Sequence, residues 1–205
     1  MAEDEELEVK FYVSDLPALE ARVRAQGASR ISIRTYEINL RFDTPDGRLS
    51  GSQKVLRLRQ DTAATLTFKG PSQNRQDVTA RQEIEFGASD FGAARRFLEA
   101  LGYTVAVIYE KQRTTYDLEG VKITLDELPY GNFCEVEGRD PQTIQAMAVR
   151  LGLDWSARVM DSYLALFGCI KEKQKLGFRD LTFNNFEHLR FSPADLGVRV
   201  ADQSV

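Results

Sequence analysis

Acidic and basic side chains recur at alternate positions along several segments of this sequence. The first segment is Glu6-Leu7-Glu8-Val9-Lys10, in which two carboxylates and an ammonium group are separated by apolar residues. In a β-strand, residues at positions i and i+2 point to the same face. Carboxylates on such a face can hold a hard divalent cation, and arginine and lysine can hold phosphate oxygens. The pattern therefore indicates either a solvated strand face or a charged, wet interior.

Seven segments share this alternation, and together they carry as many acids as bases. The acids are Glu6, Glu8, Glu83, Glu85, Asp126, Glu135 and Glu137, and the bases are Lys10, Arg57, Arg59, Lys69, Arg81, Lys111 and Arg113. Crowded carboxylates take up protons unless cations compensate them, and buried cations are costly unless they are paired. A hydrated interior that holds Mg²⁺ or Mn²⁺ with its acids and a polyphosphate with its bases would satisfy both sets. Phosphoryl chemistry of this kind requires no histidine.

The charged segments coincide with stretches of period-two alternation, which predict β-strands. Eight strands are expected, over residues 5–13, 30–43, 53–60, 64–69, 79–86, 103–117, 121–126 and 132–138. Four helices are expected, over residues 15–26, 89–101, 141–151 and 156–168. Ser14 or Asp15 can cap the first of these helices, and Ser89 opens the second.

The strand faces opposite the charges carry apolar residues such as Leu7, Leu58 and Ile123, and these faces need cover. An open sheet with its charged side in water is one solution, and a closed barrel with charges in its lumen is the other. Eight strands suffice to close a barrel around one small ligand. The balance of acids and bases favours the barrel. The predicted fold is α+β and mainly antiparallel: an eight-stranded β-tunnel with a charged lumen and helices packed outside.

Composition limits the partners that this chain of 205 residues can have. Its net charge of −4 gives no basic field for nucleic acid or acidic membranes, and its longest apolar run is too short to span a bilayer. Cys134 and Cys169 match no metal-binding or redox spacing, and no secretory signal is evident. We expect a cytoplasmic protein with free thiols, a small-molecule triphosphate as partner, and a monomer or homodimer.

The charged motifs, taken in order, resemble a known family. They are Glu6-x-Glu8-x-Lys10, Leu-Arg-Leu-Arg59, Thr-Phe-Lys-Gly-Pro71, Arg-x-Glu-x-Glu85, Glu-Lys-x-Arg113, Leu-Asp-Glu127 and Gly-x-Phe-x-Glu-x-Glu137. This series resembles the CYTH family, the triphosphate tunnel metalloenzymes, which include class IV adenylate cyclases and thiamine triphosphatases. The resemblance covers about residues 5–168 and is greatest to the cyclase-like branch.

The resemblance implies roles for the charged residues and a tunnel open at both ends, with a C-terminal helix against one mouth. Ser162-Tyr163-Leu-Ala-Leu166 resembles that helical segment. Glu6, Glu8 and Glu137 would be the first metal ligands, and Glu135 would serve a second metal or orient the attacking water. Lys10, Arg57, Arg59, Lys69, Arg81, Lys111 and Arg113 would hold phosphate, with Lys10 and Arg59 joining Glu135 as catalytic residues. The resemblance leaves the roles of the tunnel acids Glu83, Glu85 and Asp126 open.

The resemblance allows two reactions. Water can attack the terminal phosphate of inorganic tripolyphosphate, thiamine triphosphate or a nucleoside triphosphate, or the ribose 3′-hydroxyl can attack the α-phosphate of ATP to give cyclic AMP and pyrophosphate. We favour hydrolysis, because it requires no base pocket. A non-catalytic nucleotide or polyphosphate binding module is a third reading, which the retained glutamates oppose.

Residues 1–170 are therefore assigned to the tunnel domain, and residues 171–205 to a C-terminal extension of unknown role. The extension carries many aromatic residues, so it could dock on the barrel, cover a tunnel mouth or pair with a second subunit. We expect Trp155 and Tyr163 to be packing residues, with base stacking as the alternative, and His188 to lie on the surface.

Overall fold

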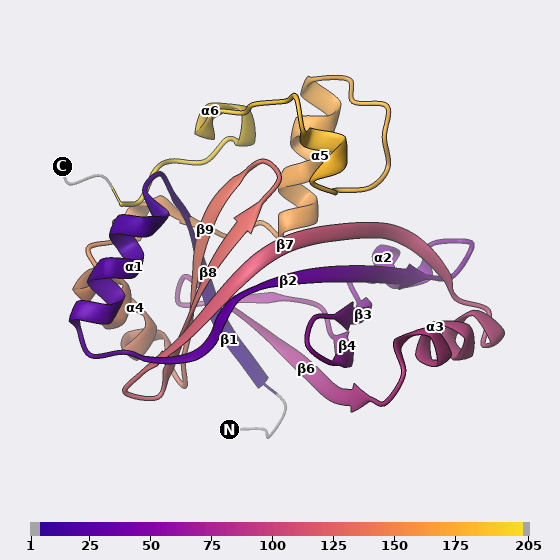
Figure 1. Ribbon diagram of the computed structural model, residues 1–205, viewed down its shortest axis with the longest axis horizontal. Helices are drawn as coiled ribbons and strands as arrows, with labels where there is room; N and C mark the ends of the chain where they lie inside the picture. The colour runs from indigo at the N-terminus through magenta and orange to yellow at the C-terminus, as the bar shows by residue number, and fades with distance from the viewer. Residues whose placement is uncertain (1–4, 203–205) are drawn as a thin grey trace.

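The computed structural model describes residues 5–202, and its central feature is a closed ring of antiparallel strands (Figure 1). In order around the ring the strands are β1 (Glu5–Val13), β9 (Gly131–Glu137), β8 (Val121–Leu128), β7 (Thr104–Leu118), β2 (Ser29–Asp43), β3 (Val55–Gln60), β4 (Ala64–Lys69) and β6 (Val78–Ala88). The ring closes where β6 pairs with β1, Glu6 opposite Arg81. Two short strands extend this sheet: β5 (Gln73–Arg75) beside β6 and β10 (Arg158–Val159) beside β1. The predicted eight-stranded antiparallel tunnel is confirmed.

The apolar faces of the strands point outward and are covered by helices, as the alternation requires. Helices α1 (Leu16–Ala25) and α4 (Pro141–Arg150) pack with β1, β8 and β9 in one apolar cluster, and α3 (Phe91–Ala100) packs against β2 and β3 in another. Figure 1 shows α1 and α4 together on one side of the ring and α3 near its other end. Each of these helices begins at an aspartate cap, and α3 is capped by Asp90 rather than by the predicted Ser89.

The helix expected over residues 156–168 is wrong at its start. Trp155–Ala157 form a single 3₁₀ turn, β10 follows, and α5 runs from Tyr163 to Lys173 with Ser162 as its cap. β10 is extended because it pairs with Lys10 and Phe11, beyond the point at which β6 leaves β1. Four further short elements were not predicted: β5, α2 (Arg48–Gly51), the 3₁₀ turn Asn184–Phe186 and α6 (Pro193–Leu196).

The C-terminal extension docks on the barrel and on α5. Phe186 is buried against Phe167, Phe178 and Phe191. Backbone hydrogen bonds join Leu181 to β7, and Ala201 donates to the carbonyl oxygen of Tyr12 in β1. In Figure 1 this segment, coloured orange to yellow, runs from α5 back to the end of β1.

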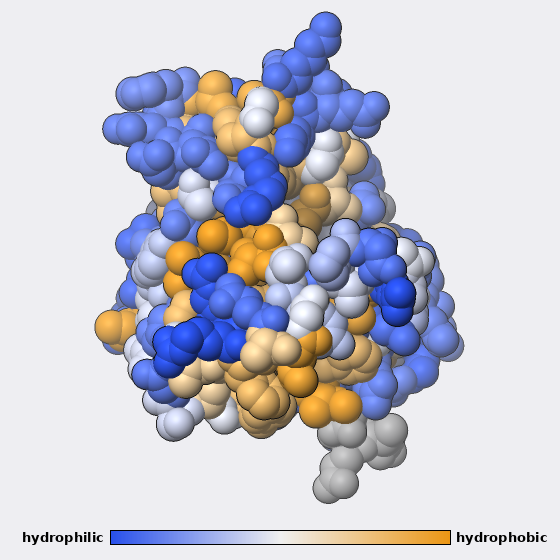
Figure 2. Space-filling view, turned by 90° about the vertical axis from the view of Figure 1, so that its right-hand side faces the viewer, coloured by the Kyte–Doolittle hydropathy of each residue, from blue (hydrophilic) through white to orange (hydrophobic). Residues whose placement is uncertain are grey.

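Some large apolar side chains remain on the surface near α3. Phe86, Phe97 and Leu101 are each exposed by at least 60%. Figure 2, which faces the end of the molecule where α3 lies, shows hydrophobic residues gathered among hydrophilic ones. No helix within residues 5–202 has both the length and the apolar character needed to cross a membrane.

Candidate active site

The lumen of the ring contains a cavity of about 650 Å³ with a mainly charged wall. All but one of the predicted site residues line it: Glu6, Glu8, Lys10, Arg57, Arg59, Lys69, Arg81, Glu83, Glu85, Lys111, Arg113, Glu135 and Glu137. The exception is Asp126, which is fully buried beneath the wall. The ring therefore brings side chains from six strands to one space, as their alternation along each strand predicts.

The wall formed by β1 and β6 holds the first two predicted metal ligands. Glu6 pairs with Lys69 at 2.8 Å and with Arg81 at 2.9 Å. Burial alone would raise the pKa of Glu6, but these two cations outweigh it and hold the pKa well below its usual range. Glu8 is 3.4 Å from Arg81 and 3.8 Å from Lys10. Glu6 is thus held in its ionised form, and both carboxylates pair with cations of the wall.

The third predicted ligand, Glu137, lies on β9 directly opposite Glu8. Burial and the neighbouring carboxylates Glu6 and Glu8 raise the pKa of Glu137, although its partner Lys122 opposes the rise. The carboxylate oxygens of Glu6, Glu8 and Glu137 are of the type that a hard divalent cation prefers as ligands. Within residues 5–202 no three such side chains already converge as metal ligands, and Glu6, Glu8 and Glu137 are each paired with a lysine or arginine.

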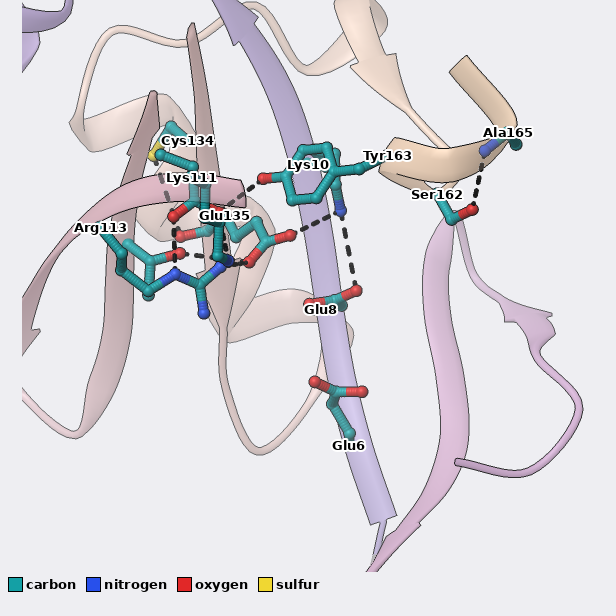
Figure 3. A network of polar contacts seen from close by, with 12 residues as sticks. Glu6, Glu8, Lys10, Lys111, Arg113, Cys134, Glu135, Ser162, Tyr163 and Ala165 are labelled. Atoms are coloured by element: carbon teal, nitrogen blue, oxygen red, sulfur yellow. Dashed lines mark hydrogen bonds and ion pairs between the residues drawn. The ribbon is translucent and has the colours of Figure 1, made fainter. Parts of the chain in front are cut away.

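Glu135 pairs with cations from two strands, Lys10 of β1 and Arg113 of β7 (Figure 3). One of its oxygens is 2.7 Å from Lys10 Nζ, and the other accepts a hydrogen bond from Arg113. Burial alone would raise the pKa of Glu135, but Lys10 and Arg113 outweigh it and hold the pKa far below its usual range. Burial would in turn lower the pKa of Lys10, but Glu135 and Glu8 reverse this and raise it. Both cations therefore stay charged at neutral pH.

Asp126 fixes the orientation of the cations from behind the wall. Its carboxylate accepts hydrogen bonds from Lys111 Nζ at 3.0 Å, Arg113 Nε at 2.6 Å and the hydroxyl of Tyr163 at 2.8 Å. With no exposed surface, Asp126 cannot touch a ligand in the cavity. Its place assigns it a positioning role.

β3, β4 and the remainder of β6 form the part of the wall that continues around the ring from β1. Arg57 Nη2 lies 3.3 Å from Glu85 and 3.0 Å from the Thr67 hydroxyl. Arg59 pairs with Asp61 at 3.2 Å and with Glu85 at 3.5 Å. Lys69 bridges Glu6 and Glu83. Burial and the nearby Glu6 carboxylate raise the pKa of Glu83 to about 7 against the effect of Lys69.

Sequence reasoning missed the contribution of β2. Glu37 is buried beside Lys111 at 3.6 Å, and Arg41, in phase with it, lines the cavity. The signal was present, because Glu37-x-Asn39-x-Arg41 alternates within the predicted strand 30–43.

Tyr163 also belongs to the site. It was expected to pack, with base stacking as the alternative. Tyr163 lines the cavity, and the Nζ atoms of Lys10 and Lys111 lie over its ring face, 4.6 and 5.5 Å from the ring centroid (Figure 3). α5 and its apolar cluster, which includes Tyr12, Tyr109 and Phe133, cover this side of the lumen. The helix that the resemblance places against one tunnel mouth corresponds to α5, whose Tyr163, Leu164 and Ala165 line the cavity. Ser50 and Gln53, which follow β2, line the cavity elsewhere.

An antiparallel ring with a lumen of balanced charge defines a class of tunnel-shaped β-proteins. The CYTH domain family matches residues 4–151, and the chain belongs to this family. It is 28% identical over 174 residues to adenylate cyclase CyaB of Aeromonas hydrophila, covering 78% of this chain and 87% of the relative.

Solved structures share the fold. A Vibrio parahaemolyticus protein provisionally assigned as an adenylate cyclase superposes with a TM-score of 0.73 at 22% identity, covering 80% of this chain and 98% of that one. A Pyrococcus horikoshii protein, PH1819, gives a TM-score of 0.66 at 26% identity, with 79% and 97% covered. A Hippeastrum protein, an adenylyl cyclase candidate described as having a dominant triphosphatase activity, gives 0.61 at 19% identity, with 80% and 95% covered.

Proposed function

We propose that this protein is a divalent-metal-dependent enzyme that hydrolyses the terminal phosphate of a triphosphate bound in the tunnel. One observation carries the proposal: a single cavity of about 650 Å³ has Glu6, Glu8 and Glu137 in its wall together with seven lysines and arginines predicted to hold phosphate. A pure anion-binding module gains nothing from carboxylates beside its ligand, whereas a metal-dependent enzyme requires them.

In this proposal Glu6, Glu8 and Glu137 would hold Mg²⁺ or Mn²⁺, with Glu135 available to a second ion. A bound ion would supply Lewis-acid neutralisation of phosphate charge. Lys69, Arg81 and Lys122, which now pair with these acids, become free to bind phosphate oxygens once the acids have another cation. The protein thus exchanges internal ion pairs for substrate contacts.

The chain's own residues then position the reacting groups. Lys10, Lys111 and Arg113, oriented by Glu135 and Asp126, neutralise the phosphoryl oxygens, and Arg57 and Arg59 hold the triphosphate from β3. Water attacks the terminal phosphorus, the bond to the bridging oxygen breaks, and the diphosphate leaves. Glu135 orients this water, and its lowered pKa keeps it an acceptor at neutral pH.

The test is release of phosphate from tripolyphosphate, ATP and thiamine triphosphate with Mg²⁺ or Mn²⁺. We expect metal-dependent phosphate release from at least one of these. Absence of turnover of every substrate across several metals and pH values would sink the enzyme proposal.

Adenylate cyclisation is the second candidate, and similarity to the Aeromonas hydrophila adenylate cyclase favours it. The ribose 3′-hydroxyl would attack the α-phosphate of ATP, and pyrophosphate would leave with its bridging oxygen. Cyclic AMP assayed in parallel with phosphate separates the two reactions, because cyclisation releases cyclic AMP and pyrophosphate in equal amounts and no orthophosphate.

Replacing a predicted metal ligand should separate turnover from phosphate binding. We expect Glu6→Gln or Glu137→Gln to reduce metal-dependent turnover at least about 100-fold, since each removes a charged ligand, while tripolyphosphate binding without metal persists. Glu99→Gln, which changes an exposed glutamate on α3, is the matched control. Full activity in either tunnel variant would refute the metal assignment.

A further inference from the structure

Arg41 is the one cation in the cavity wall that no carboxylate compensates within residues 5–202. The other lysines and arginines of the wall each have a carboxylate oxygen within 4.0 Å, whereas Arg41 has no ion pair or side-chain hydrogen bond to any described residue. Its Nε atom is buried without a partner. A partly desolvated guanidinium group without a partner is costly for the protein unless a ligand supplies the anion.

The surroundings of Arg41 increase this cost. Arg57 lies directly opposite Arg41 in the pairing of β2 with β3, and like charges at opposed positions destabilise a sheet. The carboxylate nearest in sequence on the same strand is Asp43, and its oxygens already accept hydrogen bonds from the loop that follows β2. Asp43 accepts hydrogen bonds from the backbone N–H groups of Leu49 at 2.8 Å and Ser50 at 3.0 Å, and from the Ser50 hydroxyl.

Ser50 and Gln53, from the loop held by Asp43, also line the cavity. Gln53 lines the cavity with a backbone φ of 55°, a left-handed conformation that costs energy for a residue other than glycine. Arg57 itself has an unpartnered Nε in addition to its bond to Thr67. Arg41 and Arg57, at paired positions of β2 and β3, therefore share one part of the cavity wall.

We infer that Arg41 and Arg57 form an additional oxyanion subsite on the β2–β3 side of the tunnel, and that it binds one phosphate group of the substrate. This inference rests on the proposed function, because it extends the triphosphate site by a residue outside the alternating motifs used to predict it. Guanidinium groups bind phosphate through paired N–H donors, and the unpartnered N–H groups of Arg41 are available for this.

The subsite has a consequence that does not depend on catalysis. An uncompensated cation opposite another cation destabilises the ligand-free protein, so removing its charge should stabilise that state while weakening phosphate binding. A residue whose role is to stabilise the fold would show the opposite effect on stability.

The test compares Arg41→Gln with Arg48→Gln. Arg48 is an exposed arginine of the same β2–β3 connection, paired with Asp46 and outside the cavity. Tripolyphosphate binding is measured by titration calorimetry with EDTA present, and unfolding temperature is measured without ligand. We expect Arg41→Gln to weaken binding at least about tenfold and not to lower the unfolding temperature, since a charged hydrogen bond is typically worth that factor or more. Arg48→Gln should leave the affinity unchanged.

Arg41→Lys provides a second variant, which keeps the charge without the paired donors, and it should recover only part of the affinity. Wild-type affinity in Arg41→Gln, or a marked fall in its unfolding temperature, would overturn the subsite. The proposed function fails separately: a wild type that binds tripolyphosphate but turns over no substrate refutes the hydrolase, while the affinities of the Arg41 variants still decide the subsite.

Discussion

Asp126 shows how a single buried residue can organise the site without touching a ligand. It joins Lys111, Arg113 and Tyr163, which come from β7 and α5, and it has no exposed surface. Removing one partner of a buried ion pair leaves the others uncompensated. The cations of the site are therefore held in position before substrate arrives, which lowers the cost of ordering them on binding.

Tyr163→Phe tests the part of this arrangement that α5 supplies. Loss of the hydroxyl removes its hydrogen bond to Asp126, so we expect a loss of about 1 kcal/mol in unfolding free energy and several-fold slower turnover. Urea unfolding and initial rates measure the two effects. Tyr103→Phe is the control, because the Tyr103 hydroxyl makes no side-chain hydrogen bond to residues 5–202. An unchanged urea midpoint in Tyr163→Phe would contradict the predicted role.

Among the elements, the β2–β3 connection depends on one carboxylate. Burial alone would raise the pKa of Asp43, but hydrogen bonds from Ser50, Leu49 and Thr44 outweigh it and lower the pKa to about 2. An unfolded aspartate has a pKa near 3.9. Asp43 therefore stabilises the protein above about pH 4, and this contribution is lost as the pH falls toward 2.

Asp43→Asn should reveal this dependence. We expect the variant to unfold at a lower temperature than wild type at pH 7, because an amide oxygen is a weaker acceptor and its NH₂ group cannot accept. The difference should shrink between pH 4 and pH 2.5, as wild type takes up the proton. Thermal unfolding at a series of pH values measures it. A difference that is constant over this range would rule out the ionised carboxylate as its source.

The strands were predictable because side-chain alternation is local and the tunnel needs the same period on every strand. β10 was not, because Arg158 and Val159 are extended only through their pairing with β1, far away in sequence. The roles of Tyr163 and Asp126 escaped prediction for a similar reason. The Tyr163 hydroxyl donates a hydrogen bond to Asp126, and the two residues are 37 positions apart in the sequence. Arg41 differs from both, because its alternation with Glu37 and Asn39 is visible in the sequence. The sequence does not show, however, that Arg41 has no ion-pair partner among the described residues.

At the scale of the molecule, the C-terminal extension shares its core with the tunnel. One apolar cluster contains Phe133 of β9, Tyr163 of α5 and Phe186 of the extension. Asp202, at the far end of the extension, accepts hydrogen bonds from the backbone N–H groups of Ser14 and Asp15. We therefore expect the extension and the barrel to unfold together.

Phe186→Ala tests this coupling. Phe186 is 2% exposed, and truncating a buried phenylalanine costs about 3–5 kcal/mol. We expect one cooperative transition shifted to lower urea concentration, together with reduced turnover, because α5 loses support. Phe97→Ala changes a side chain that is 62% exposed and should shift stability by at most about 0.5 kcal/mol. Two separate transitions in the Phe186 variant would show that the extension folds independently.

The position of β1 in the ring has a consequence for synthesis of the protein. β1 carries Glu6, Glu8 and Lys10, yet its partners β6, β9 and β10 are made much later. Until β9 leaves the ribosome, β1 cannot be paired on both edges, and Glu137 has not joined the first two glutamates. Nascent chains should therefore be inactive, and the alternating charges of β1 would keep its unpaired edges from aggregating during that interval.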